Sequence, residues 1–156
     1  MSSNPYAPPK SQALDVKQKA DAPPLWNPNA AASWSLIFSP AFGAYLHMKN
    51  WQALGNVENA ASSKKWIYIY AGFVLLLALV VGFAPDSKIF DGLSRAAGFA
   101  LLISWYYAIG KTQITYVKAE FGSTYPKKGW LVPILAGIGI WFAVAFVIGM
   151  VAFAVS

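Results

Sequence analysis

Few residues in this sequence combine a reactive side chain with a spacing that could do chemistry. The only histidine, His47, has no Asp or Glu within ten residues of it, and the chain contains no cysteine. A metal site or a general acid–base pair needs such groups close together. The six acidic residues are scattered, without paired spacing. We therefore predict no enzyme activity, no catalytic residue, no metal and no cofactor, and we expect His47 to be a polar tip at a membrane surface.

The sequence also shows few residues that could form a transport pathway through a membrane. The long apolar blocks contain no Asp, Glu, Lys or Arg, whereas proton relays and ion pathways in membranes normally use such groups. Arg95 stands at the end of a block, where it is expected to anchor a helix at the membrane surface. Gly137 and Gly139 lie inside an apolar block, without the Lys-Ser/Thr pair of a phosphate loop. A pore would have to use hydroxyl groups, and its lining would comprise Ser33, Ser35, Ser39, Ser104 and Thr112.

Small residues, by contrast, recur with a spacing that has a physical meaning. In one helical block they repeat every four residues, and the last block contains two more pairs. These residues are Ala96, Ala100, Ser104, Ala108 and Thr112, then Gly139 with Ala143 and Ala145 with Gly149. Small side chains at this spacing let a second helix approach closely, which is how helices associate in lipid. We predict a helix-packing interface, either within the chain or with a partner protein or a second copy.

The composition indicates which elements carry these residues. Of the 156 residues, 57% are hydrophobic and only 12% are charged, whereas a soluble domain has about a quarter of its residues charged. The net charge is +6, but the cations flank apolar blocks and do not form a dense cluster. This pattern indicates an all-α membrane protein and argues against a nucleic-acid partner.

Three apolar blocks predict transmembrane helices. Residues 66–84 and 130–155 are uncharged, and at about 1.5 Å per residue each is long enough to cross the hydrocarbon core. Residues 93–110 form a shorter block with Arg95 near one end and Lys111 just after the other, and these two side chains can extend to the membrane surface. Apolar residues spaced three and four apart continue this third helix to residue 121, in the cytoplasm.

The block at residues 30–54 is apolar, but Ser39 and Pro40 interrupt it. Because Ser followed by Pro is typical of a helix start, the block divides into two short helices, each about half as long as the hydrocarbon depth. We expect a re-entrant hairpin with its break at Ser39 and Pro40; the alternative is four transmembrane helices. The proline-rich residues 1–29 predict a disordered tail, which leaves 30–156 as the helical membrane domain.

Charge placement favours the re-entrant hairpin. With a hairpin, ten of the twelve Lys and Arg residues share one side of the membrane, and only Lys88 and Arg95 lie opposite. A true crossing would divide the same cations seven against five. Because positively charged flanks stay in the cytoplasm, we place the N-terminus in the cytoplasm and the C-terminus in the periplasm, across a bacterial inner membrane.

One segment, WNPNAAASWSLIFSPAFGAYLHMKNWQALG, resembles the N-terminal motif of small bacterial inner-membrane proteins grouped as domains of unknown function. Their pattern is an aromatic-rich FF-x-P-x-(F/W)-x-x-Y, followed by a cation and a Trp. Here it falls on Phe38, Pro40, Phe42, Tyr45, Lys49 and Trp51. The chain departs from the pattern at Lys49, where an Arg-Lys pair often stands. The resemblance implies an inner-membrane location and brings no assigned activity.

Together these features predict a non-enzymatic, multi-pass membrane protein that acts through helix–helix interaction. An accessory subunit and a toxin-immunity protein are both consistent with this prediction. The alternative is a small oligomeric channel or carrier. The expected partners are the lipid bilayer and either another membrane protein or a second copy of the chain.

Overall fold

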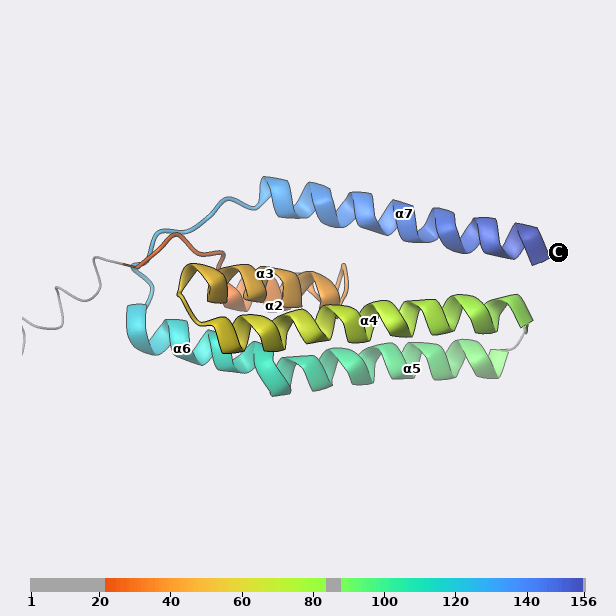
Figure 1. Ribbon diagram of the computed structural model, residues 1–156, viewed down its shortest axis with the longest axis horizontal. Coiled ribbons are helices and arrows are strands. Elements are labelled where there is room, and N and C mark those ends of the chain that lie inside the picture. Colours follow the sequence, from red (N-terminus) through yellow and green to blue (C-terminus); the bar gives the residue numbers. More distant parts are fainter. Residues whose placement is uncertain (1–21, 84–87, 156) are drawn as a thin grey trace, which may run out of the picture.

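The computed structural model describes residues 22–83 and 88–155, and it shows a bundle of helices (Figure 1). In chain order these are α2 (Pro28–Trp34), α3 (Pro40–Ala53), α4 (Val57–Phe83), α5 (Lys88–Trp105), the π-helical turn η2 (Tyr106–Gly110), α6 (Lys111–Phe121) and α7 (Leu131–Val155). Within the described ranges the only β pairing is an isolated bridge between Leu25 and Lys127. The predicted all-α fold class is confirmed.

α2 and α3 form a hairpin whose two limbs lie side by side in Figure 1. The side-chain oxygen of Asn27 caps α2, and Ser39 Oγ caps α3 by accepting the backbone N–H of Phe42 at 3.3 Å. Pro28 and Pro40 take the first helical positions, where the missing N–H of proline is not needed. Because the chain reverses between the limbs, both outer ends of the hairpin lie at the same end of the molecule.

Three longer helices extend past the tip of the hairpin. α4 and α5 run side by side, and α7 runs along the opposite side of the hairpin (Figure 1). Among the described residues, two segments are long and apolar enough to cross a membrane, Val57–Val80 and Leu131–Val151. α5 is less apolar because Lys88, Asp91 and Arg95 lie in its first turns, so its crossing stays a prediction.

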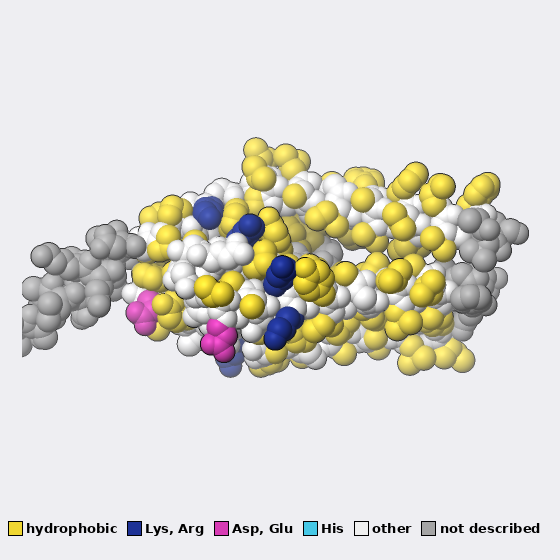
Figure 2. Space-filling view, in the orientation of Figure 1, with side chains coloured by type: hydrophobic (Ala, Val, Ile, Leu, Met, Phe, Trp, Pro, Cys, Tyr) yellow, Lys and Arg dark blue, Asp and Glu magenta, His cyan; other side chains and the backbone are white. Residues whose placement is uncertain are grey.

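Buried side chains are concentrated at the end that holds the hairpin. The largest apolar ones are Leu25, Leu46, Trp51, Trp105 and Val117. Beyond the hairpin, α4, α5 and α7 expose large apolar side chains along their length. On the face shown in Figure 2, this half carries no Lys, Arg, Asp or Glu. An exposed apolar surface of this extent needs lipid or protein around it, which indicates association with a membrane.

The segment just before α2 corrects the predicted extent of the tail. Residues 22–29 were assigned to it, but Ala22 and Leu25 are buried in the core. The Leu25 N–H donates to the carbonyl of Pro126 at 2.9 Å, and the N–H of Lys128 donates to the carbonyl of Leu25 at 2.9 Å. Proline-rich composition indicates disorder only where no other segment offers a partner, and here the residues before α7 supply one. Residues 1–21 lie outside the described part of the chain.

Two helices begin earlier than the predicted spans. α4 begins at Val57 because Asn56 Oδ1 accepts the N–H of Asn59 at 2.9 Å, which starts the helix two turns before the apolar block. α5 begins at Lys88, ahead of the predicted residue 93. Residue 84, the predicted end of the first span, is outside the described residues.

Candidate functional site

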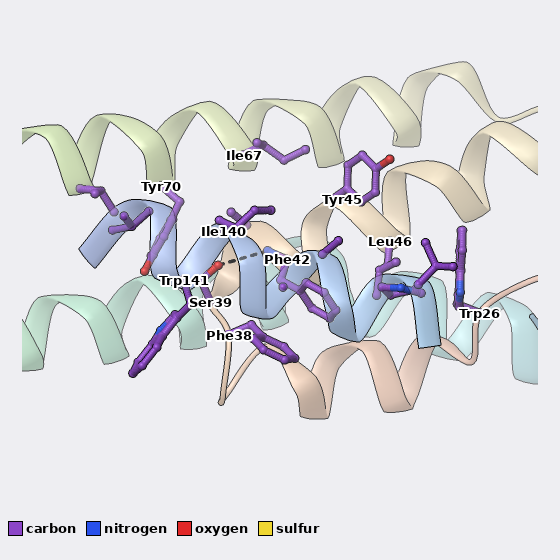
Figure 3. A pocket seen from close by; sticks show the side chains of 17 residues that line it. Trp26, Phe38, Ser39, Phe42, Tyr45, Leu46, Ile67, Tyr70, Ile140 and Trp141 are labelled. Atoms are coloured by element: carbon purple, nitrogen blue, oxygen red, sulfur yellow. Dashed lines mark hydrogen bonds between the residues drawn. The ribbon is translucent and has the colours of Figure 1, made fainter. Parts of the chain in front are cut away.

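An apolar groove of about 530 Å³ lies between α3, α4 and α7. We call it the α3–α4–α7 groove. Its walls include Phe42 from α3, Ile67 and Tyr70 from α4, and Ile140 and Trp141 from α7 (Figure 3). This volume is within the range of small-molecule binding sites, about 300–1,000 Å³. The groove is therefore large enough to hold a ligand.

α7 forms one wall because it packs closely on the tip of the hairpin. A side chain at Gly137 would place its Cβ 3.0 Å from the ring of Phe38, so glycine permits this approach. The rings of Phe38 and Phe42 are 4.8 Å apart, and those of Trp34 and Trp130 are 6.4 Å apart. The approach of Gly137 to Phe38 and the contact between Trp34 and Trp130 hold α7 close to the hairpin, while the Phe38–Phe42 contact lies within the hairpin.

The groove has a cationic end and an apolar end. In Figure 3, Trp26 lies at one end and Trp141 with Tyr70 at the other. The ammonium of Lys128 is 4.4 Å from the centre of the Trp26 ring, and that of Lys49 is 5.7 Å from the Tyr45 ring. Because Trp26 and Tyr45 both line the groove, the two ammonium groups lie beside its walls, and the apolar end carries no cation.

Next to the groove, a buried polar network joins three parts of the chain. Asn50 Oδ1 accepts the N–H of Trp26 at 3.0 Å, and Asn50 Nδ2 donates to the carbonyl of Trp26 at 2.8 Å and to Gln113 Oε1 at 3.1 Å. Gln113 Nε2 in turn donates to the carbonyl of His47 at 2.8 Å. Asn50, His47 and Gln113 are fully buried. We call Trp26, His47, Asn50 and Gln113 the Asn50 clamp, because they hold the segment before α2, α3 and α6 together.

The sequence predicted that His47 would be a polar tip at a membrane surface. The structure shows that this prediction is wrong, because His47 is a buried member of the Asn50 clamp. Its Nε2 donates to the carbonyl of Pro28 at 3.1 Å, so Nδ1 is left as an acceptor. Within the described residues, neither His47 Nδ1 nor Trp105 Nε1 has a hydrogen-bond partner. The two rings are 5.4 Å apart. Burial lowers the pKa of His47 to about 4, although its bond to Pro28 opposes this shift, so the imidazole is neutral at pH 7.

This buried histidine predicts that the fold weakens in acid. The unfolded chain takes up a proton on His47 below pH 6.5, whereas the folded chain does not until about pH 4. The contribution is therefore fully present above pH 6.5 and is lost as the pH falls towards 4. We expect the free energy of unfolding to drop by about 2 kcal/mol between pH 7 and pH 5, measured by denaturation in detergent micelles. His47 is the only histidine, so H47Q should remove most of this dependence; an unchanged profile in H47Q would contradict the assignment.

The structure leaves the predicted packing residues uncovered. Those in the block from α5 to η2 are all exposed, namely Ala96, Ala100, Ser104 and Ala108. Those in α7 are exposed as well, namely Gly139, Ala143, Ala145 and Gly149. The two sets are not brought together within the chain. The π-helical turn η2 also interrupts the repeat after Ser104, so the regular spacing does not continue as one straight stripe into Ala108.

The hydroxyl groups predicted for a pore are not brought together either. Ser35 is buried and its Oγ donates to the carbonyl of Ala31 at 2.9 Å, while Ser39 caps α3. Ser33 and Ser104 are exposed on different helices, α2 and α5. Ser39 lines the α3–α4–α7 groove and Ser33 lines a second pocket beside Trp105, and neither of these two pockets is lined by another hydroxyl of the set.

Comparison with models of known protein families, with curated protein sequences and with solved structures gives no match to this chain. The resemblance to small inner-membrane proteins at Phe38–Trp51 accordingly stays a prediction. In the described part of the chain, no three His, Cys, Asp or Glu residues are grouped to hold a metal ion. What the chain does must therefore be argued from its surfaces and its groove.

Sequence reasoning missed both the groove and the Asn50 clamp. Asn50 and Gln113 are polar residues inside otherwise apolar helical patterns, and this was the only available signal for the clamp. The groove had no signal, since its walls come from helices far apart in the sequence.

Proposed function

We propose that this chain is a non-enzymatic, multi-pass membrane protein that works by binding another membrane protein through α5 and α7. The observation that carries the proposal is that small residues at helix-packing spacing are exposed on both helices. Ala96, Ala100 and Ser104 occupy successive turns of α5 ahead of η2, and nothing in the described chain covers them. In lipid, helices associate by close packing at small residues. An uncovered set of such residues is therefore a surface for a partner.

The proposed membrane placement follows from the depth of the hairpin. At its tip, Phe38 and Ser39 share the groove with Tyr70 and Val74 of α4. In α4 these two residues lie about 8 and 14 Å beyond Lys65, at about 1.5 Å per residue. The hydrocarbon core is about 30 Å thick. If Lys65 marks the surface, the tip reaches close to the midplane, as a re-entrant hairpin would.

Because positively charged flanks stay in the cytoplasm, we place the N-terminus in the cytoplasm and the C-terminus in the periplasm of a bacterial inner membrane. Because the chain has no cysteine, single cysteines can test it in intact cells with a membrane-impermeant reagent. We expect labelling at K88C and S156C, and none at S2C, A61C or S123C. Labelling of S2C would instead support four spans. The structure exposes Ala61 and Ser123, so burial would not explain an absence of labelling at these positions. It also exposes Lys88, where labelling is expected.

Disulfide crosslinking in native membranes tests the partner surface. With cysteine at Ala100, an oxidant should produce a disulfide-linked band of higher mass with a second copy of the chain. A bifunctional thiol–amine reagent should instead produce such a band with a different partner, by joining this cysteine to one of the partner's lysines. Phe99 is also exposed but projects from another side of α5, so F99C is the matched control. Equal crosslinking from both positions, or none from A96C, A100C and S104C, would refute the proposal.

A further inference from the structure

The α3–α4–α7 groove stays open after the chain has folded. On its α7 wall, Val132 is 75% exposed, and Ile140 and Trp141 are each 63% exposed. In Figure 2 a gap separates α7 from the helices beneath it in the half beyond the hairpin. Apolar walls left open at membrane depth must be covered by an apolar occupant.

The length of the groove matches one leaflet of a bilayer. Its α7 wall runs from Val132 to Val144, which is about 18 Å along a helix. Half of the hydrocarbon core is about 15 Å. An acyl chain that enters at one membrane surface and ends near the midplane would therefore lie along the whole groove.

The charges at one end indicate the head of this occupant. Lys128 and Lys49 lie beside the Trp26 and Tyr45 walls. Within residues 22–83 and 88–155, no carboxylate pairs with either ammonium, and no Asp or Glu lines the groove. A second transmembrane helix without acidic residues would satisfy the apolar walls but would leave these cations unpaired. A lipid with a phosphate group satisfies both requirements, because its acyl chain covers the apolar walls and its phosphate pairs with the two ammonium groups.

We propose that the α3–α4–α7 groove binds one anionic phospholipid, with an acyl chain between α4 and α7 and the phosphate at Lys128 and Lys49. This site is separate from the partner surface on α5. The arrangement follows a general pattern in which basic side chains at the membrane surface attract anionic lipid heads. The proposal does not depend on which compartment holds the N-terminus.

Native mass spectrometry of the full chain in detergent tests the proposal. We would titrate in phosphatidylglycerol and, separately, phosphatidylcholine with the same acyl chains. One phosphatidylglycerol should bind first, and the variants K128Q and K49Q should each weaken it roughly fivefold. K118Q is the charge-matched control, because Lys118 lies on α6 away from the groove. Equal binding of the two lipids, or an equal effect of K118Q, would overturn the role of the cations.

Two further arms test the acyl chain. Ala136 lines the groove and is exposed, so A136F should fill the space and abolish the first binding event. Ala71 on α4 is exposed, lies outside the groove at a comparable depth, and serves as control through A71F. Glycerol 3-phosphate, which has the head without the chain, should not compete. Unaltered binding in A136F, competition by glycerol 3-phosphate, or a dimer in which a second copy occupies the groove would each overturn the proposal.

Discussion

Alanine in place of Gly43 is expected to lower the free energy of unfolding by about 3 kcal/mol, the upper part of the range for overpacking a core. A Cβ at Gly43 would overlap Ser35 Oγ and would lie 2.5 Å from Cη2 of Trp105. Neither neighbour can move away, because Trp105 is fully buried and Ser35 is bonded to the preceding turn of α2. The added methyl must therefore separate the two limbs of the hairpin or displace Trp105. Unfolding in mixed detergent micelles, followed by circular dichroism, measures the loss.

Gly72 provides the matched control for this variant. It also lies inside a helix, but an added Cβ would meet nothing within 4 Å. Because alanine favours a helix over glycine by about 1 kcal/mol, G72A should be neutral or slightly stabilising. The two identical substitutions should thus change stability in opposite directions. A similar effect of both would show that Gly43 is not a contact point.

Alanine in place of Asn50 is expected to cost about 3 to 5 kcal/mol. The substitution leaves three groups without a partner, the part-buried N–H and carbonyl of Trp26 and the buried Oε1 of Gln113. Each unpaired buried group costs about 1–3 kcal/mol, and networked groups lose more than isolated ones. The same denaturation measurement applies, and tryptophan fluorescence should report release of Trp26 from the core surface.

Gln52 is the control on the same helix, since it is exposed, and Q52A should change stability by less than about 0.5 kcal/mol. A double-mutant cycle of N50A with Q113A tests the clamp directly. If the two residues act as one network, the double variant should be markedly more stable than the sum of the two losses implies. Additive losses would contradict the clamp.

Local signals were sufficient to predict where the hairpin helices begin. Ser39-Pro40 combines a capping side chain with a proline at the first helical position, and the structure starts α3 at this proline. Asn27-Pro28 has the same pattern, and α2 begins at Pro28, inside the segment that was assigned to the tail. α3 ends at Ala53, two residues before Gly55, whose φ of +72° favours glycine. Such signals act over a few residues and do not depend on the rest of the fold.

Interactions between distant segments could not be predicted in this way. On hydropathy alone, His47 and Asn50 are expected at a surface. In the structure they are buried, because Asn50 bonds to the carbonyl of Trp26 and the carbonyl of His47 accepts from Gln113. Leu25 was assigned to the tail because its neighbours are prolines, although its partner lies just before α7. The small residues of α5 have a spacing that predicts helix packing, but they are exposed in the structure, so the spacing alone does not identify the helix that would pack on them.

The bridge between Leu25 and Lys127 has a consequence for biogenesis. Residues near Leu25 leave the ribosome early, but the strand-like segment that they pair with emerges only when the chain is almost complete. Until then the Leu25 side chain and the backbone around it lack their partners and are exposed to water or bound by a chaperone, since contacts between distant segments form late. The residues just before α7 therefore complete this part of the fold, and we expect a chain that stops before Tyr125 to be recognised as incomplete and degraded.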